Sequence, residues 1–409
     1  MSLYRALSTA ALAVLAALPP SVGAQSKRAG NPESQLPSNI VQLTGFGERP
    51  SWSPDDKRVA FMAKSFGDAF EVEVATRTIR LLTGHFAHAG FLRVQYLPNG
   101  DFFLIGARSF TDIRTTRARD QEMWVLKADA GAPPTPLGHK ISEGVAISRK
   151  RMKIAWSNTR AQYPDLLQEG ESVMYTADIV YKDGVPALAN KKEVLRAHAP
   201  ECTLEAQDFR RDDAELIYTC YRSSYADVMG VDLATGKLTT YRKLPDEYDE
   251  VEGISPDGVW TLVESSREQG PDRQNSRYIN IWKLKLEPNS TDFVRLTHWG
   301  DYEGYKASNP VVSNDGKRIA FQSARNNEAG EDIRYLARDQ ADGLPDHDYW
   351  LFDSRKLLIM HFDSDDRFTH GEVIKDPTVI VEHNYWRDTA WHKAVRRDSF
   401  ANEQHIGRF

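Results

Sequence analysis

Short apolar runs separated by turn sequences dominate the pattern of hydrophobic and polar positions in this chain. The stretch PSWSPDDKRVAF, Pro50 to Phe61, places a polar turn between two apolar strands, and PVVSNDGKRIAF, Pro310 to Phe321, repeats the pattern. Proline at the second turn position presets φ, aspartate or asparagine caps the turn, and glycine accepts a positive φ. The sequence therefore predicts β-hairpins whose corners are specified by the turn residues.

The hairpin turn recurs along the whole chain. Four well-formed copies and two degenerate ones, spaced by 44 to 62 residues, occur at 53–56, 97–100, 148–151, 210–213, 255–258 and 313–316. An apolar strand follows each turn, and third and fourth strands follow in most units. Units of four short antiparallel strands at this spacing are typical of propeller blades, so the predicted fold class is all-β, a six-bladed β-propeller. A β-sandwich with fortuitous turns is the alternative.

The two ends of the repeat region predict how the ring closes. The segment NIVQLTG at 39–45 matches the fourth-strand segment TIRLLTG at 78–84, yet it precedes the first hairpin. We expect it to complete the last blade, because such closure ties the ends together and removes exposed sheet edges. The propeller should then span 39–353, with DHDYWLFD at 346–353 as the third strand of the sixth blade.

The segments outside the repeats differ from the repeats in composition. Residues 1–24 combine Arg5, an apolar run and a small-residue cleavage site, which predicts a secretory signal peptide and a secreted or vesicle-lumen protein. Residues 25–38 read as a flexible lead-in. Residues 354–409 carry dense mixed charge and no repeat, and their order is left open. No later segment approaches the ~20 apolar residues of a membrane span.

Charge and cysteine content add three expectations. The net charge of −6, with acidic and basic residues interleaved, gives no basic face for nucleic acid. Cys202 and Cys220 flank a predicted strand-turn-strand, and in an oxidising compartment we expect a disulfide, with two buried thiols as the alternative. Asn289 begins the triplet Asn-Ser-Thr, a candidate glycosylation site.

The repeated segments QLT…PSWSPDDKRVAF and RLT…NPVVSNDGKRIAFQS resemble the propeller repeat of TolB-type proteins over about residues 40 to 352. Within that group, a single propeller with a signal peptide and one internal cysteine pair resembles the hetero-Diels–Alderases of fungal tropolone-sesquiterpenoid pathways. The resemblance implies polyketide and terpene substrates: a tropolone-derived heterodiene joins a humulene-type alkene to form a dihydropyran. It implies no cofactor and no metal.

Several residues suggest chemistry but have simpler interpretations. No G-x-S-x-G sequence is present, which argues against a propeller fused to a hydrolase domain. His85 and His88 lack a third ligand at fixed spacing, so we interpret them as loop histidines. Asp55 and Asp257 are interpreted as turn formers.

The first strand of each propeller blade lines the central channel, and the loop before it forms the mouth. These segments deliver the candidate residues. Donors to the tropolone oxygens, and a carboxylate that assists dehydration as acid or base, are predicted to be catalytic: His88, Arg93, Tyr302 and Lys306, with Glu252. The residues predicted to bind substrate are Glu48, Trp52, Phe91, Gln95, Gln207 and Tyr305.

Two alternatives to a cycloaddition enzyme stay open at this point. One is a non-catalytic secreted propeller that binds a protein or glycan across its mouth. The other is a lactonase-like hydrolase, which needs a metal at the channel and a carboxylate cluster that Glu48, Glu143, Glu205 and Glu252 would supply.

Overall fold

The structure is a computed structural model of the whole chain and describes residues 27–223, 225–268, 278–325, 334–352, 354–365 and 367–396. The chain divides into two units, Met1–Ala329 and Gly330–Phe409. The predicted signal peptide at 1–24 lies outside the described residues. The division falls earlier than the boundary at 353 that the repeat pattern predicted.

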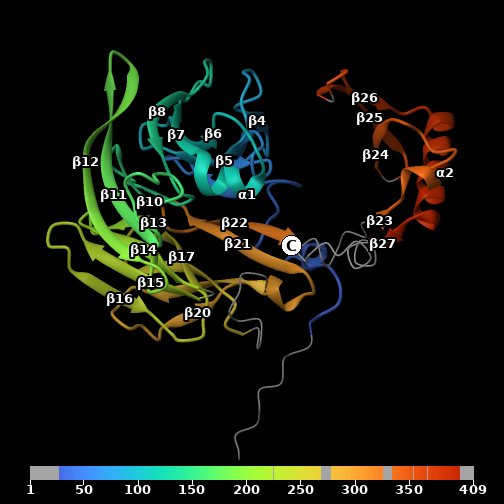
Figure 1. Cartoon of the computed structure of the whole chain (residues 1–409). Helices are drawn as coiled ribbons and strands as arrows, with labels where there is room; N and C mark the ends of the chain where they lie inside the picture. Colours follow the sequence, from blue (N-terminus) through green and yellow to red (C-terminus); the bar gives the residue numbers. More distant parts are fainter. Residues whose placement is uncertain are drawn as a thin grey trace, which may run out of the picture. The chain divides into compact units, whose positions relative to one another are not determined.

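Antiparallel sheets make up the first unit (Figure 1). Its described residues form five four-stranded sheets and one two-stranded sheet, each built from consecutive strands. The first sheet contains β1 (Glu48–Trp52), β2 (Arg58–Met62), β3 (Ala69–Glu73) and β4 (Ile79–Leu81). The second contains β5 (Phe91–Tyr96), β6 (Phe102–Ala107), β7 (Gln121–Leu126) and β8 (Thr135–Lys140). The third contains β9 (Val145–Ile147), β10 (Lys153–Thr159), β11 (Glu171–Lys182) and β12 (Val185–His198). The fourth sheet contains β13 (Thr203–Arg210), β14 (Glu215–Arg222), β15 (Tyr225–Asp232) and β16 (Leu238–Arg242). The fifth contains β17 (Asp249–Ile254), β18 (Trp260–Ser265), β19 (Asn280–Lys285) and β20 (Phe293–Arg295). The sixth contains β21 (Tyr305–Val312) and β22 (Ile319–Arg325).

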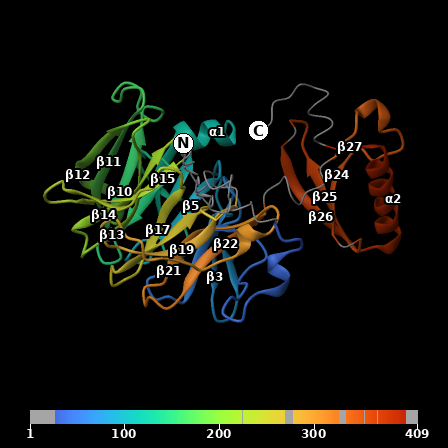
Figure 2. The same ribbon diagram turned by 90° about the horizontal axis from the view of Figure 1, so that it is seen from below.

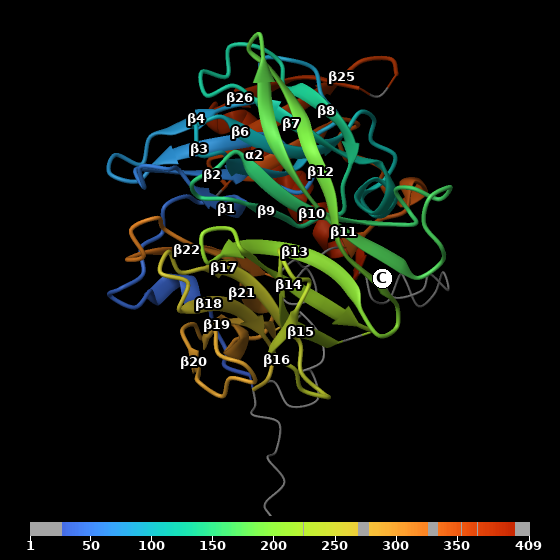
Figure 3. The same ribbon diagram turned by 90° about the vertical axis from the view of Figure 1, so that its left-hand side faces the viewer.

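Short helical turns connect some of these strands. They are η1 (Pro32–Gln35), α1 (Ile113–Thr115), η2 (Thr116–Asp120) and η5 (Trp299–Asp301). The hairpin β11–β12 is the longest and extends beyond the other strands in the view of Figure 3.

Neighbouring sheets pack face to face around a common centre. Strand β1 contacts β5, β9 contacts β13, β13 contacts β17, β17 contacts β21, and β21 contacts β1. Six hydrophobic clusters lie between successive sheets; one joins Phe103 and Ile105 to Trp156, and another joins Trp52 and Val59 to Ala320. Sheets that bury both faces against neighbours in this way form a β-propeller, which confirms the predicted all-β propeller fold.

The predicted hairpin turns are confirmed by their hydrogen bonds. The amides of Asp56, Gly100, Gly258 and Gly316 donate to the carbonyl three residues earlier at 2.8–3.0 Å. In the first and last copies the serine hydroxyl also donates to the aspartate two residues on, at 2.7 Å. Gly100, Gly258 and Gly316 have φ of 90°, 69° and 72°, the conformation for which glycine was expected.

The first and last sheets are joined by a set of contacts that we call the seam latch. The Asp56 carboxylate accepts the Asn314 amide at 2.7 Å and the Asp315 amide at 2.8 Å. Arg318 donates to the Asp56 carbonyl at 2.8 Å, and the Trp52 indole donates to the Val311 carbonyl at 3.2 Å. These hydrogen bonds and the Trp52–Ala320 cluster hold the two ends of the repeat region together.

The prediction that an N-terminal strand completes the last sheet was wrong for the described residues. Residues 39–46 form no strand, and β22 pairs only with β21. Leu36, Ile40 and Leu43 instead pack their side chains into the neighbouring cores. Their spacing of four and three residues does not follow the alternation with period two that a strand needs.

The lead-in is also tied to the propeller within its described part. The Arg28 amide donates to the Asp301 carbonyl at 2.7 Å, and Lys27 Nζ donates to the Gly300 carbonyl at 2.8 Å. Polar composition suggested a free segment, but these main-chain contacts hold it beside η5.

The second unit has its own small sheet. Strands β24 (Asp348–Phe352), β25 (Lys356–Phe362) and β26 (Phe368–Ile374) form an antiparallel meander, and α2 (Pro377–Lys393) covers one face of it (Figure 2). The remaining elements are β23 (Arg334–Tyr335), paired with β27 (Val395–Arg396), and η6 (Arg338–Gln340). Residues 348–352 were expected as a blade strand; they pair with β25 instead, because a short local turn costs less loop-closure entropy than a return to β22.

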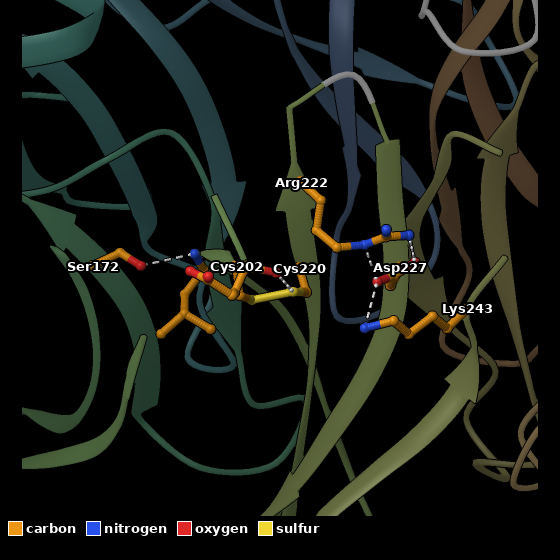
Figure 4. The surroundings of a disulfide bond; sticks show 8 residues. Ser172, Cys202, Cys220, Arg222, Asp227 and Lys243 are labelled. Atoms are coloured by element: carbon orange, nitrogen blue, oxygen red, sulfur yellow. Dashed lines mark hydrogen bonds and ion pairs between the residues drawn. A yellow bond between two sulfur atoms is a disulfide. The ribbon is translucent and has the colours of Figure 1, made fainter. Parts of the chain in front are cut away.

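The two cysteines are bonded, as expected. Cys202 precedes β13 and Cys220 lies on β14, with Cα atoms 5.1 Å apart (Figure 4). The bond joins the residue just before β13 to β14 in the fourth sheet, next to the ion pair of Arg222 with Asp227. The two-thiol alternative is therefore excluded in this structure.

Candidate active site in the propeller channel

A cavity of about 130 Å³ lies where the first strands of all six sheets meet. Five of the residues predicted from the sequence line it: Trp52, Arg93, Gln95, Gln207 and Glu252. They reach the cavity because a first strand has no inner neighbour, so the side chains on its inner face point at the centre. Their roles stay predictions.

The hairpin-turn end of the cavity is crossed by Arg149. Its guanidinium, from the turn after β9, donates to the Ile254 carbonyl at 2.7 Å and to Asn314 Oδ1 at 3.1 Å. It also lies 3.9 Å from the Asp208 carboxylate. One side chain from the third sheet thus links the fourth, fifth and sixth sheets beneath the cavity.

Arginines surround a single carboxylate on one side of the channel; we call Arg49, Arg93, Arg117 and Glu143 the arginine cluster. Arg49 donates to Glu143 at 2.8 Å, Arg117 Nε donates at 2.6 Å, and Arg93 lies 3.8 Å away. Burial alone would raise the pKa of Glu143, but the three guanidinium groups outweigh it and lower this pKa to about 2. Glu143 is therefore ionised at every physiological pH.

Carboxyl groups gather on the opposite side, from the fourth and fifth sheets; Glu205, Glu250, Glu252 and Glu264 form what we call the carboxyl cluster. Burial first, and then the neighbouring carboxylates, raise the pKa of Glu205 and of Glu264 to about 8. The same causes raise the pKa of Glu252 well above its usual value. Glu250 and Glu264 stand directly opposite each other on β17 and β18, where two ionised carboxylates would repel.

Hydrogen bonds connect the cluster to neighbouring side chains. The phenol groups of Tyr221 and Tyr248 both donate to Glu250, the first at 2.5 Å. Glu264 accepts the Asn309 amide and is hydrogen-bonded to Glu252, so these two carboxyl groups can share a proton. The cluster therefore holds protons next to the cavity at neutral pH.

Three polar groups of residues that line the cavity are left without partners. Within the described part of the chain, Arg49 Nε, Arg93 Nε and Gln95 Oε1 are buried and make no hydrogen bond. The Arg93 side chain is 12% exposed. A buried donor and a buried acceptor without partners cost free energy unless a water or a ligand satisfies them.

Three further predicted site residues do not line the cavity, and their roles stay predictions. His88 accepts the Gly90 amide at Nδ1 (2.9 Å), so its Nε2–H donates to Asp68 at 3.0 Å, which fixes the loop before β5. Phe91 and Tyr305 are 3% and 4% exposed within hydrophobic clusters. They lie at the start of first strands, where the side chain that faces an adjacent sheet is buried.

The remaining predicted residues do not line the cavity. Glu48 pairs with Arg49 and accepts Ser65 Oγ at 2.6 Å. Lys306 is close enough to Glu264 to oppose the rise of its pKa. Tyr302 forms a β-bridge with Arg28 of the lead-in. Asn289 lies in an exposed turn, and its glycosylation stays a prediction.

Sequence reasoning missed several residues that contact the channel groups. Glu264, Tyr221 and Tyr248 lie on second strands or on the loop before β17, and Arg117 and Arg149 lie on connections. One signal was available: Glu264 stands in the apolar run WTLVES, where an acidic residue is unusual unless it has a buried partner. Within the described ranges, no three His, Cys, Asp or Glu side chains are arranged to hold a metal ion. Nor does any helix there have the length and apolarity to cross a membrane.

Comparison with known proteins adds little to this geometry. Residues 312–402 match a family described as a domain of unknown function (DUF6879). No curated protein matches the chain. Similar solved structures include TolB from Acinetobacter baumannii (15% identity, 77% of this chain and 80% of that one, TM-score 0.40) and putative TolB from Agrobacterium tumefaciens (14%, 80% and 79%, 0.31). Another is oligogalacturonate lyase from Vibrio parahaemolyticus (13%, 70% and 80%, 0.43).

Proposed function

We propose that the channel cavity is the active site of an enzyme that moves a proton on a small anionic substrate. Arg93 binds the anion, and Glu252 gives or takes the proton. The observation that carries the proposal is that Arg93, with an unsatisfied Nε, and Glu252, with a raised pKa, line the same cavity. Perturbed carboxyl groups beside a specific charge partner in a cleft are typical of acid–base sites.

The substrate class follows from the cavity groups that have no hydrogen-bond partner in the protein. A guanidinium binds carboxylate or phosphate oxygens in a bidentate manner, and Gln95 Oε1 accepts from a hydroxyl or amine. The volume of about 130 Å³ corresponds to a molecule of roughly benzene size. A small 2-hydroxy acid has these features.

The reaction class is removal of the C–H proton next to the carboxylate. Glu252 in its ionised form takes this proton, and the electron pair left on carbon is delocalised into the carboxylate, where Arg93 stabilises the added charge. Glu264 shares a proton with Glu252 and so sets the pH at which Glu252 becomes a base. The rate is expected to rise with pH through the raised pKa of the pair.

The test is α-proton exchange in D₂O, followed by NMR with lactate, glycerate, malate and tartrate as probes. Wild type should exchange the α-proton of at least one probe, and Glu252→Gln should slow exchange by about 10²-fold or more. Arg93→Met should raise KM. The control is Glu122→Gln, which removes a partner of Arg108 away from the cavity. Binding without exchange would favour the non-catalytic propeller, and neither binding nor exchange would overturn the proposal.

The hetero-Diels–Alder reaction implied by the resemblance stays a prediction and has its own assay. A pocket for drug-sized ligands usually holds ~300 Å³ or more, so a cavity of about 130 Å³ favours a smaller reactant than a tropolone with a terpene. The assay is chiral product analysis with and without protein. A faster reaction that gives one stereoisomer would favour the cycloaddition over proton transfer.

A further inference from the structure

The small sheet of the second unit has an apolar face on the side away from α2. On the covered side, Tyr349 Oη donates to the His383 carbonyl of α2 at 3.2 Å, and the two rings lie 4.8 Å apart (Figure 2). Side chains alternate along a strand, and residues opposite each other on paired strands share a face. The other side, which we call the open face, therefore contains Trp350, Phe352, Leu358, Phe362, Phe368 and Val373.

The open face exposes a large apolar area. Its four aromatic side chains are 43% to 59% exposed, and Val373 is 58% exposed. A fully buried aromatic side chain covers 150–250 Å², so the four rings present about 400 Å² to solvent. Monomeric proteins that expose a contiguous apolar patch of this size usually use it for binding. The apolar run at 357–360 in β25 is also typical of a strand that is covered on both faces.

Charged side chains mark the two ends of the open face. Asp348, at the start of β24, stands opposite Met360, and Lys356, at the start of β25, stands opposite Phe352. Both charged side chains are exposed and belong to the open face. Met360 and Lys356 are four residues apart on one strand, so the two charges are about 13 Å apart along the strands. One end of the face is therefore acidic and the other is basic.

The adjoining turns have the same polarity. Asp363 and Asp365 are exposed next to the acidic end, and Lys375 is exposed next to the basic end. Arg367 lies at the acidic end but pairs with Asp365 at 3.4 Å. Asp376 lies at the basic end but caps the N-terminus of α2. The charge pattern of the open face is therefore complementary to its own pattern when the strand direction is reversed.

We propose that the open face binds the open face of a second copy of this chain, with the strands of the two copies antiparallel. The two-fold axis then runs across the strands, along the row of Trp350, Leu358 and Val373, so each of these side chains packs on its own counterpart. Asp348 of each copy lies one strand spacing, about 5 Å, from Lys356 of the second copy. An axis along the strands would instead bring the two acidic ends together.

The area fits a dimer of moderate affinity. Each partner in a standard interface contributes ~800 Å², and the four aromatic rings supply about half of that area. Leu358, Val373 and the aliphatic stem of Lys356 add to it. The expected Kd is therefore micromolar. This proposal does not depend on the function of the channel.

The test is sedimentation velocity of the full chain at increasing protein concentration. Wild type should form a dimer, and Trp350→Arg, which puts two positive charges at the axis, should weaken it at least tenfold. Since Trp350 is 57% exposed, Trp350→Arg is expected to fold, which a thermal unfolding midpoint checks. Tyr385→Arg is the matched control: this aromatic residue of α2 is 66% exposed, and the variant should form the dimer as wild type does.

Charge exchange tests the orientation of the two copies. Asp348→Lys alone and Lys356→Asp alone each bring like charges together across the axis, so each should weaken the dimer several-fold. An equimolar mixture of these two variants restores opposite charges at both contacts. The mixture should therefore form a mixed dimer that is tighter than the dimer of either variant alone.

Three results would overturn the proposal. The first is a wild-type chain that stays monomeric at every concentration, which would mean that the open face does not bind a second copy. The second is a dimer of unchanged affinity in Trp350→Arg, which would place the interface elsewhere on the chain. The third is a mixture of the two charge variants that associates no better than either alone, which would exclude the antiparallel arrangement.

Discussion

The two sides of the propeller channel contain carboxyl groups at similar burial but in opposite protonation states. In the arginine cluster, three guanidinium groups lower the pKa of Glu143 to about 2. In the carboxyl cluster, burial and like-charged neighbours raise the pKa of Glu205 and Glu264 to about 8. Burial disfavours the charged form on both sides, so the sign of the pKa shift depends on the partner.

The two sides of the channel therefore differ in their charged groups: guanidinium groups gather on one side and carboxyl groups on the other. The arginine side comes from the first three sheets and the carboxyl side from the fourth and fifth, while Arg93 feels the charges of both. Each cluster depends on the partners that set its charge state, so single substitutions should affect the two sides in different ways. The predictions below test that difference, in order of decreasing effect.

Replacing Arg49 with Met should cause the largest loss of stability. Arg49 is 9% exposed and binds Glu143, so its removal leaves a buried carboxylate with fewer partners. We expect a loss of about 3 to 4 kcal/mol in the free energy of unfolding, measured by urea denaturation. Arg119→Met is the control, because the exposed side chain of Arg119 pairs with Asp120 and not with Glu143, and its midpoint should match wild type. An Arg49→Met protein as stable as wild type would show that the arginine cluster contributes no stability.

Breaking the disulfide should loosen the carboxyl side without changing its charge. Cys220 pairs with Leu204, the neighbour of Glu205 on β13. Cys202→Ser should lower stability by about 2 to 3 kcal/mol, equally at pH 5 and pH 9. Thermal unfolding at both pH values checks this, and Cys202→Ser/Cys220→Ser should behave in the same way. A loss that depends strongly on pH would mean that the disulfide also shifts the carboxyl pKa values.

Glu264→Gln should flatten the dependence of stability on pH. The unfolded chain releases this proton near pH 4.5, whereas the folded protein holds it to about pH 8. Stability is therefore complete at low pH and is lost as the pH rises through this window, by a few kcal/mol, since one pKa unit corresponds to about 1.4 kcal/mol. At pH 9 the variant should exceed wild type by about 2 kcal/mol. Urea midpoints from pH 5 to 9 measure it, with the exposed Glu169→Gln as control; parallel curves for wild type and Glu264→Gln would contradict it.

Tyr248→Phe should have the smallest effect. It removes one of the two phenol donors to Glu250 and leaves the ring in place. The expected loss is about 1 kcal/mol, the usual net contribution of one hydrogen bond. Tyr385→Phe, on an exposed residue of the second unit, should change nothing. A larger loss for Tyr385→Phe would invalidate the assignment.

The sequence predicted the parts of the fold that depend on local chemistry. The turns at Ser53 and Ser313 and the apolar strands after them follow from residues that are close in sequence. Residues 39–46 were expected to complete the last sheet, and this prediction was wrong. The neighbour of β22 is decided by packing between residues far apart in the sequence. The partner expected for residues 348–352 was also wrong: a strand pattern does not name its partner, and β24 pairs through a short local turn with β25.

The candidate site was predictable only as far as the first strands. Trp52, Arg93 and Glu252 line the cavity because a propeller places those strands at its centre. The sequence did not indicate that Glu264 reaches Glu252 from the next strand, since that depends on cross-strand register. Likewise, the sequence did not indicate that His88 is hydrogen-bonded to Asp68, which lies 20 residues earlier in the chain.

The seam latch has a consequence for protein synthesis. Asp56 and Asn314 are 258 residues apart, so at ~5 to 20 residues per second the ribosome needs about 13 to 50 seconds to make the second after the first. During that time the apolar face of the first sheet, with Trp52, Val59 and Phe61, has no sixth sheet to cover it. Contacts this far apart form late and slow folding. The nascent chain therefore exposes this apolar face until its last sheet has been synthesised. We expect chaperones to bind the first sheet during translation.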